Sequence, residues 1–163
     1  MKIRVKLHDG QQPLEILEQG DWIDLRSNMY YKSPGISVQA GVPIIDNKLL
    51  PLGISMELPK YFEANILPRS SSFKRFGFML LNSMGIIDSS YCGNKDEWMV
   101  NLLFFKESEI VKGDRIVQFR IRPSQFAPWW VHLKWIFKKK IEFVYVDDLE
   151  NNDRGGFGSS GTK

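Results

Sequence analysis

The chain has 163 residues, of which 43% are apolar, enough for one domain with its own hydrophobic core. The net charge is only +3 and the basic residues are mostly scattered, so we expect no nucleic-acid partner. The single cysteine, Cys92, excludes an intrachain disulfide and a zinc site made of several cysteines. We find no apolar run long enough for a signal peptide or a membrane span, and we therefore expect a cytoplasmic protein with no membrane partner.

Short strand-like segments follow one another along the chain. In Ile3–Leu7, apolar side chains alternate with basic ones, which is the pattern of a half-buried strand. Other segments combine β-branched or aromatic residues with turn residues at their ends, and these are 18–25, 38–45, 49–58, 61–67, 76–81, 98–105, 115–121 and 141–146. We expect Pro43, Asp46–Asn47 and Pro51 to act as breaks. This spacing predicts an all-β sandwich or barrel without internal repeats.

One short inserted helix is predicted at 128–140. Its proline suits a first helical turn, and Trp129, Leu133, Ile136 and Phe137 fall on one face. The lysines at its end suit the negative end of the helix dipole. Interleaved aromatic and basic residues are typical of a membrane-surface or nucleic-acid contact. We favour the other interpretation, in which the helix folds over one end of the barrel and buries its tryptophans.

The segment Asn82–Gly93 predicts a strand, a tight turn and the start of a return strand. It places Asp88 at the bend and Tyr91 three residues later. The carboxylate could orient a water molecule while the ring packs on a sugar-like ligand. A surface turn that the aspartate merely caps is the alternative.

The glycine-rich tail Asn151–Lys163 has almost nothing apolar to bury, and we expect it to be mobile when no ligand is bound. It also holds Arg154, Phe157 and several serines, which suit contacts with phosphates and a base. A lid and a disordered terminus both remain open. Two other polar turns, Pro68–Ser71 and 112–118, offer phosphate contacts or serve only as turns.

The order and spacing of these segments resemble the trimeric dUTP nucleotidohydrolases (dUTPases) over most of the chain. Five family motifs find counterparts in Asp21–Leu25, Pro68–Ser71, Gly85–Gly93, Gly113–Gln118 and Arg154–Gly161. The resemblance implies a jelly-roll β-barrel domain over 1–147, interrupted by the insertion at 128–140, and a flexible C-terminal arm over 148–163. It also implies a homotrimer with three active sites at subunit interfaces.

The implied reaction is hydrolysis of dUTP to dUMP and pyrophosphate, which keeps uracil out of DNA and supplies dUMP. Asp88 matches the acid that activates the attacking water, and Tyr91 matches the ring beneath deoxyribose. Asn82 and the backbone around Ile86 and Ile87 match the groups that read uracil.

The resemblance also assigns the phosphate contacts, to Arg69, Ser70, Ser71, Gln118, Arg154, Gly158, Ser159 and Ser160. Phe157 would lie over the base. The implied cofactor is Mg²⁺, held by the triphosphate and water rather than by a protein ligand, with Asp24 as a candidate hydrogen-bond partner of the outer shell.

The chain departs from the family pattern in two places. Only two glycines separate Arg154 from Phe157, and a longer loop after Gly93 could bring Trp98 near the base. Two alternatives stay open, a dCTP deaminase-like enzyme, which shares an R-S-S turn, and a regulatory module that uses this fold to bind a protein.

Overall fold

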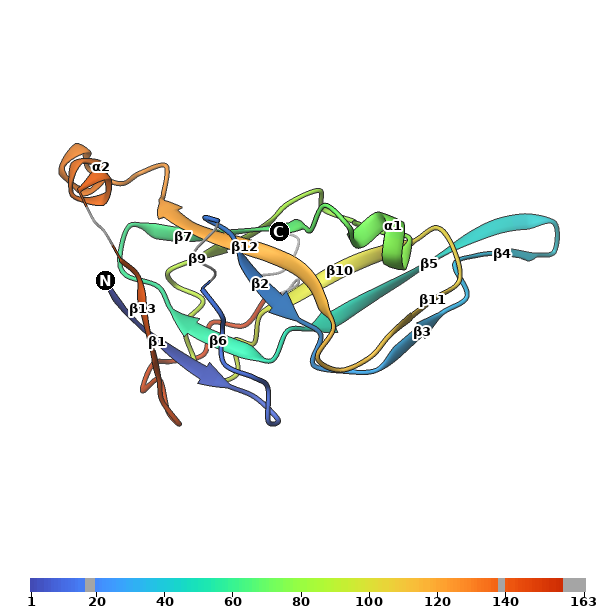
Figure 1. Cartoon of the computed structure of the whole chain (residues 1–163), viewed down its shortest axis with the longest axis horizontal. Helices are drawn as coiled ribbons and strands as arrows, with labels where there is room; N and C mark the ends of the chain where they lie inside the picture. Colours follow the sequence, from blue (N-terminus) through green and yellow to red (C-terminus); the bar gives the residue numbers. More distant parts are fainter. Residues whose placement is uncertain (17–19, 138–139, 157–163) are drawn as a thin grey trace.

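The computed structural model describes residues 1–16, 20–137 and 140–156 (Figure 1). Predicted segments within 157–163, including Phe157, Gly158, Ser159 and Ser160, lie outside the described residues. In the described ranges, strands are joined by two short helices, as expected for an all-β protein.

The strands form four hydrogen-bonded sheets. Their orders are β13-β1-β6, β4-β5-β10-β8, β11-β3 and β2-β12-β7-β9. The strand bounds are β1 Lys2–Leu7, β2 Ile23–Arg26, β3 Tyr31–Ser33, β4 Ile36–Gln39, β5 Val42–Pro51, β6 Ile54–Glu57, β7 Phe62–Pro68, β8 Phe78–Leu80, β9 Gly85–Asp88, β10 Met99–Phe104, β11 Ser108–Ile110, β12 Arg115–Pro123 and β13 Glu142–Tyr145. The arrangement is of jelly-roll type, but the described strands do not close into one hydrogen-bonded barrel.

A single hydrophobic core fills the space between these sheets. Its largest fully buried side chains are Trp98, Phe78, Phe104 and Phe119. The Trp98 and Phe119 rings meet edge to face with centroids 5.2 Å apart. Trp98 is 0% exposed, so the loop before it does not bring its ring to a surface where a base could bind. The suggestion that Trp98 contacts the base is therefore wrong for this chain.

Of the expected breaks, Pro51 is the last residue of β5, but Pro43 and Asp46–Asn47 lie inside the strand without interrupting it. Pro43 lies where β5 pairs only with β4, so its missing N–H costs no ladder bond on the other edge. Asp46 is tolerated because its carboxylate accepts hydrogen bonds from the Tyr31 hydroxyl (2.8 Å) and the Ser33 hydroxyl (2.5 Å). Burial and the neighbouring Asp46 raise the pKa of Tyr31 to about 12.

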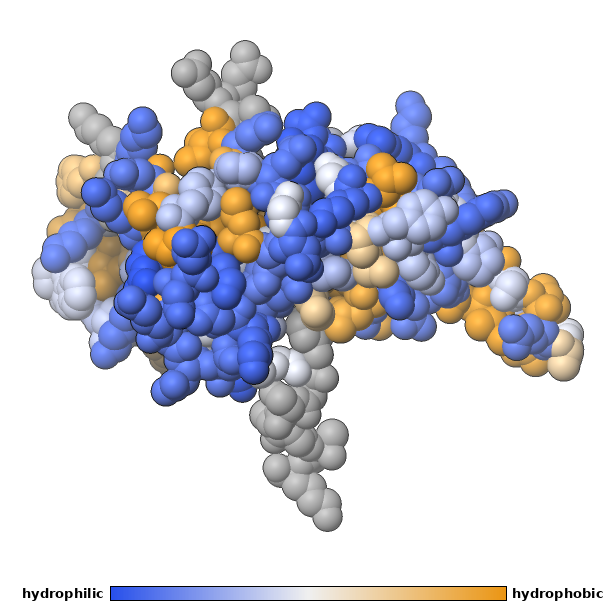
Figure 2. Space-filling model, turned by 90° about the horizontal axis from the view of Figure 1, so that it is seen from below, coloured by the Kyte–Doolittle hydropathy of each residue, from blue (hydrophilic) through white to orange (hydrophobic). Residues whose placement is uncertain are grey.

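Strands β4 and β5 form a hairpin that projects from the body (Figure 1). Its apolar side chains remain exposed and colour the right-hand tip in Figure 2; they are Ile36, Val38, Val42, Ile44 and Ile45. A two-stranded ribbon with no core of its own is only marginally stable in water.

Three short elements escaped prediction, namely β3, β11 and α1 (Ser72–Phe76). Each has only three to five residues, too few for a periodic pattern. The return strand expected directly after Asp88 is absent, because residues 91–98 form a loop and the next strand begins at Met99.

Helix α2 (Trp129–Ile136) confirms the predicted insertion but not its packing. Pro128 is its N-cap, and only Val131 is buried. Trp129 and Trp130 are exposed, so the expectation that the helix buries its tryptophans is wrong. In Figure 1 the helix lies at the end of the molecule opposite the β4–β5 hairpin. No helix in the described ranges is long and apolar enough to cross a membrane.

Candidate active site

Asp88 is the last residue of β9, at an edge of the sheet β2-β12-β7-β9. Its Oδ1 accepts hydrogen bonds from the Ser90 N–H (2.8 Å) and from the Ser90 hydroxyl. Its Oδ2 accepts a hydrogen bond from Arg154 Nη1 at 2.6 Å. Three bonds leave part of the carboxylate's acceptor capacity unused, and the side chain is half exposed, so a water molecule has access to it.

The surroundings of Asp88 keep it ionised. Partial burial works to raise the pKa of this carboxyl group, but the hydrogen bonds from Ser90 and the guanidinium of Arg154 outweigh it. The net result is a pKa below the usual value for aspartate. At neutral pH the group is therefore a carboxylate, the form that accepts a proton.

Asp96 holds the described part of the C-terminal arm against the loop after β9. Its buried carboxylate accepts backbone N–H bonds from Arg154 (2.9 and 3.1 Å), Gly155 (2.9 Å) and Gly93 (2.9 Å). Burial opposes ionisation of this group, but these bonds prevail and hold its pKa below the ordinary value. No local pattern predicts this role, because Asp96 lies in a polar loop and its arm partners are 58 and 59 residues away.

Other contacts extend this anchor towards the start of the arm. Leu149 is fully buried, and its N–H donates to the side-chain oxygen of Asn94 at 3.0 Å. The Asn94 amide in turn donates to Asp148 at 2.7 Å, and Lys95 N–H donates to Asp153 at 2.7 Å. The expectation of a mobile tail is therefore wrong for 151–156, since this part of the arm is hydrogen-bonded to the body.

Tyr91 lies beside Asp88 with a fixed orientation. Its hydroxyl donates to the Glu97 carbonyl at 2.9 Å, and its ring packs against the hydrophobic core. Gly156 lies directly over the ring, because a Cβ at that position would be only 3.1 Å from Tyr91 Cε2. Glycine thus permits close approach of the arm to the ring.

The predicted uracil-reading residues come just before Asp88 along the chain. Asn82 is exposed in the turn before β9, Ile86 is exposed, and Ile87 points into the core. β9 pairs with β7 on one side only among the described strands, through Ile86↔Asn65 and Ile87↔Ala64. Its other edge therefore presents backbone donors and acceptors.

The second group of predicted residues lies at the far end of β7. The Asp24 carboxylate forms one ion pair with Arg69 Nε at 2.7 Å and another with Arg115 Nη1 at 3.3 Å. Gln118 stands opposite Asp24 in the sheet, and its amide donates to the Pro68 carbonyl at 3.1 Å. Ion pairing fixes the guanidinium of Arg69 next to the Pro68–Ser71 turn.

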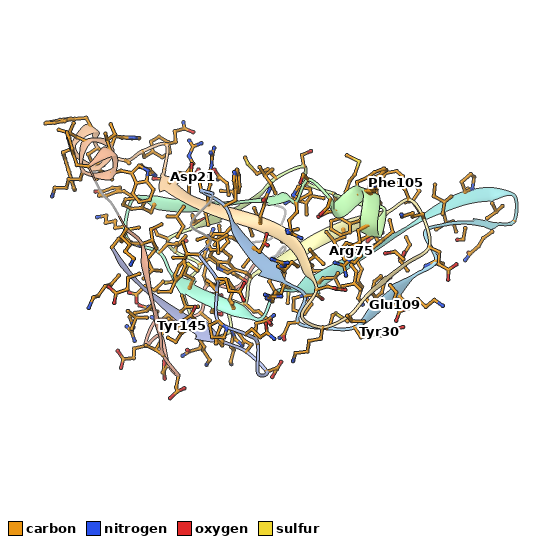
Figure 3. The ribbon with its side chains drawn as sticks, in the orientation of Figure 1. Asp21, Tyr30, Arg75, Phe105, Glu109 and Tyr145 are labelled. Carbon is orange, nitrogen blue, oxygen red and sulfur yellow. The ribbon has the colours of Figure 1, made fainter. Side chains whose placement is uncertain are left out.

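Ser70 and Ser71 are exposed at this turn. In the part of the chain that the structure describes, their hydroxyls make no side-chain hydrogen bond, which leaves them available to a ligand. Asp21, the first residue of the first motif, precedes β2, and Figure 3 shows it well apart from Arg75 of α1.

One chain does not bring these two groups together. Asp88 pairs with Glu63 near the start of β7, whereas the phosphate turn follows Pro68 at its end. Five residues of strand span about 17 Å. Groups that act on one phosphate must lie within about 3 Å of its atoms or of the attacking water.

The described residues hold no group of three or more His, Cys, Asp or Glu side chains that could bind a metal ion. Each carboxylate oxygen of Asp24 already accepts a bond from an arginine, and the side chain is only 14% exposed. The side chains of this site therefore do not form a ready ligand set for a bare cation.

An all-β fold with an arginine and two hydroxyls on one turn and an ionised carboxylate on an edge strand suits an enzyme that acts on a phosphorylated ligand. No family model matches the chain. However, the chain is 41% identical over its whole length to the SPbeta prophage-derived deoxyuridine 5'-triphosphate nucleotidohydrolase of Bacillus subtilis (strain 168), which it covers completely. The chain belongs to the deoxyuridine 5'-triphosphate nucleotidohydrolase (dUTPase) family.

Solved structures agree on the fold. The dUTPase of Streptococcus mutans superposes with a TM-score of 0.62 at 17% identity, covering 76% of this chain and 98% of the other. A mutant dUTPase from phage phi11 of S. aureus, described with a structural Mg(II) ion, gives a TM-score of 0.61 at 13% identity, covering 77% and 93%. These neighbours confirm the all-β, jelly-roll type of fold predicted from the motifs.

Proposed function

We propose that this protein hydrolyses dUTP to dUMP and pyrophosphate. The observation that carries the proposal is Asp88, an ionised and accessible carboxylate held by Ser90 and Arg154 at the end of an edge strand. Membership of the dUTPase family identifies dUTP as the substrate on which this carboxylate would act.

In the proposed reaction, Asp88 accepts a proton from a water molecule while the water oxygen attacks the α-phosphorus. The bond from the α-phosphorus to the bridging oxygen breaks, and pyrophosphate leaves. General-base assistance of this kind contributes roughly 10²–10⁴-fold to the rate. The remaining acceptor capacity of the Asp88 carboxylate supports this role.

Substrate selection is proposed to come from the elements around Asp88. The Tyr91 ring, fixed through Glu97, would pack beneath deoxyribose and exclude a 2′-hydroxyl. The free edge of β9 and the exposed Asn82 would read uracil as a paired base would.

The phosphates are assigned to Arg69, Ser70, Ser71 and Gln118, with the arm supplying further contacts. Arg154 would exchange its bond with Asp88 for one with a phosphate, because a triphosphate carries more negative charge than a single carboxylate. Losing that guanidinium would raise the pKa of Asp88 towards its usual value and make it a better base. For the arm residues beyond the described ranges, the proposal is unchanged. Phe157 would contact the base, and the phosphates would contact Gly158, Ser159 and Ser160.

Mg²⁺ is proposed to arrive with the triphosphate rather than in a protein cage. Bound in this way, it would neutralise part of the phosphate charge, and Mg²⁺ usually retains several waters in such sites. Because Asp24 is largely buried and paired with two arginines, we assign this chain no direct ligand, and Asp24 stays a candidate hydrogen-bond partner of the outer shell.

A homotrimer is the proposed assembly. The separation of about 17 Å between Asp88 and the Pro68–Ser71 turn supports it, since a second copy would bring its own phosphate turn to Asp88. The exposed apolar side chains next to β9, among them Met79, Leu81 and Ile86, offer a surface for this contact.

The test is a nucleotide panel of dUTP, dCTP, UTP and dTTP with Mg²⁺, followed for pyrophosphate and for ammonia. We expect pyrophosphate from dUTP alone. Asp88→Asn keeps the shape of the side chain and removes the base, so it should bind dUTP and lose at least about 100-fold in kcat, the lower limit for general-base assistance.

Two results would contradict the proposal. Ammonia release from dCTP would identify a deaminase-like enzyme instead. Near-normal pyrophosphate release by Asp88→Asn would remove Asp88 from the reaction and overturn its assignment as the general base.

A further inference from the structure

Helix α2 presents an apolar face to solvent. At about 100° per residue, Trp129, Leu133, Ile136 and Phe137 share an arc about 100° wide. All four are exposed, with Trp129 at 76% and both Ile136 and Phe137 at 73%. The face predicted from the sequence therefore exists, but it points away from the core.

The opposite side of α2 fixes the helix to the body. Val131 is buried, and the Trp135 ring meets Phe62 edge to face with centroids 5.3 Å apart. Trp130 meets Tyr61 in the same way at 6.3 Å. Because these contacts attach α2 to the body of the protein, its apolar face remains exposed to solvent.

The charge around this face has one sign. Between 124 and 140 the sequence contains four lysines and no aspartate or glutamate. Lys134 lies at the border of the apolar arc, with its ammonium group 5.0 Å from the Trp130 ring centroid. Phe126, just before the helix, adds another exposed ring.

We propose that α2 docks this protein onto an anionic lipid surface. An outward apolar face with tryptophan and phenylalanine, next to Lys134 and in a lysine-rich stretch of sequence, is the composition of a helix that lies in the membrane interface. Eight residues are too few to span, so the helix would lie on the surface with its apolar side chains among the headgroups.

Charge and shape favour a lipid over other occupants. In a two-fold contact between two copies of α2, Lys134 of one copy would meet the like charge of the other. In a nucleic-acid contact, Leu133 and Ile136 would occupy the centre of the face without stacking on a base. The lipid surface satisfies both the apolar centre and the basic border, and it reverses our expectation of no membrane partner.

The test is flotation of the full chain with vesicles of phosphatidylcholine alone and with added phosphatidylglycerol. We expect binding to the anionic vesicles that weakens with salt, since each basic residue near such a surface contributes about fivefold. The double variant Ile136→Ser/Phe137→Ser should bind at least about tenfold more weakly, because it removes two side chains that would be buried in lipid.

Matched controls distinguish docking from loss of folding and from nonspecific adsorption through exposed apolar residues. Val38→Ser/Val42→Ser removes two exposed apolar residues from the β4–β5 hairpin and should leave vesicle binding unchanged. Both double variants should melt like the parent and turn over dUTP normally, since neither touches the candidate active site.

Three outcomes would overturn the proposal. They are equal vesicle binding by the parent and Ile136→Ser/Phe137→Ser, self-association without vesicle binding that this variant abolishes, and a shift of single-stranded DNA without vesicle binding. Activity is measured separately, so failure of this docking and failure of dUTP hydrolysis are distinguishable.

Discussion

Replacing Asp96 by asparagine should release the C-terminal arm. The carboxylate oxygens accept three backbone N–H groups, two of them from Arg154 and Gly155 of the arm. Asparagine has one acceptor oxygen and places an NH₂ group in the other position. In either orientation one N–H, from the buried Gly93 or the partly buried Gly155, loses its partner and faces another donor.

The cost follows from this geometry. Leaving a buried donor unpaired, together with the loss of charge-assisted hydrogen bonds, amounts to about 2–4 kcal/mol. If the arm opens locally, the amides of Arg154 and Gly155 should exchange with solvent about 30- to 1,000-fold faster than in the parent. If the arm unfolds only with the whole domain, Tm should fall by roughly 2–4 °C per kcal/mol.

The pH dependence has a definite sign. The pKa of Asp96 is lowered in the folded protein, so its stabilising contribution is present above the unfolded value of about 3.9. The contribution is lost as pH falls through the lower folded pKa. Protection of the Arg154 and Gly155 amides should therefore decline in acid in the parent, and this decline should be absent in Asp96→Asn.

Hydrogen exchange measured by NMR, on the parent and on two variants, decides the matter. Asp153→Asn is the matched control, because it removes the same charge nearby while keeping the oxygen that accepts Lys95 N–H. Unchanged exchange at Arg154 and Gly155 in Asp96→Asn would refute the view that this carboxylate anchors the arm.

Two further predictions concern the catalytic group and its assembly. Arg154→Gln removes a hydrogen bond and a charge that lower the pKa of Asp88. The acidic limb of the kcat/KM profile should therefore move to higher pH. If the limb stays in place, Arg154 does not influence the pKa of the catalytic base. Asp88→Asn and Arg69→Ala chains, each inactive alone, should regain activity when assembled together, with about a quarter of the sites intact by random assortment. No recovery at any mixing ratio would mean that each chain holds a complete site.

Local patterns were sufficient for much of the fold. Alternation in β1 and the apolar, aromatic and β-branched residues of β7, β10 and β12 predict strands because side-chain period and hydrogen bonding agree there. β5 was predicted less well, since Pro43 and Asp46 read as breaks. Only the pairing with β4 and the hydroxyls of Tyr31 and Ser33 make these two residues acceptable in a strand.

Five ordered motifs were sufficient to predict the family, and local chemistry singled out Asp88, Tyr91 and Arg69 as candidates. Where these groups lie relative to one another became known from the folded chain alone. It put Asp88 and Arg69 near opposite ends of β7, gave Asp96 the arm to hold, and turned the apolar face of α2 outward. The physical reason is that strand pairing and packing join residues tens of positions apart, and no periodicity or motif records which partner a buried carboxylate or a helix face will meet.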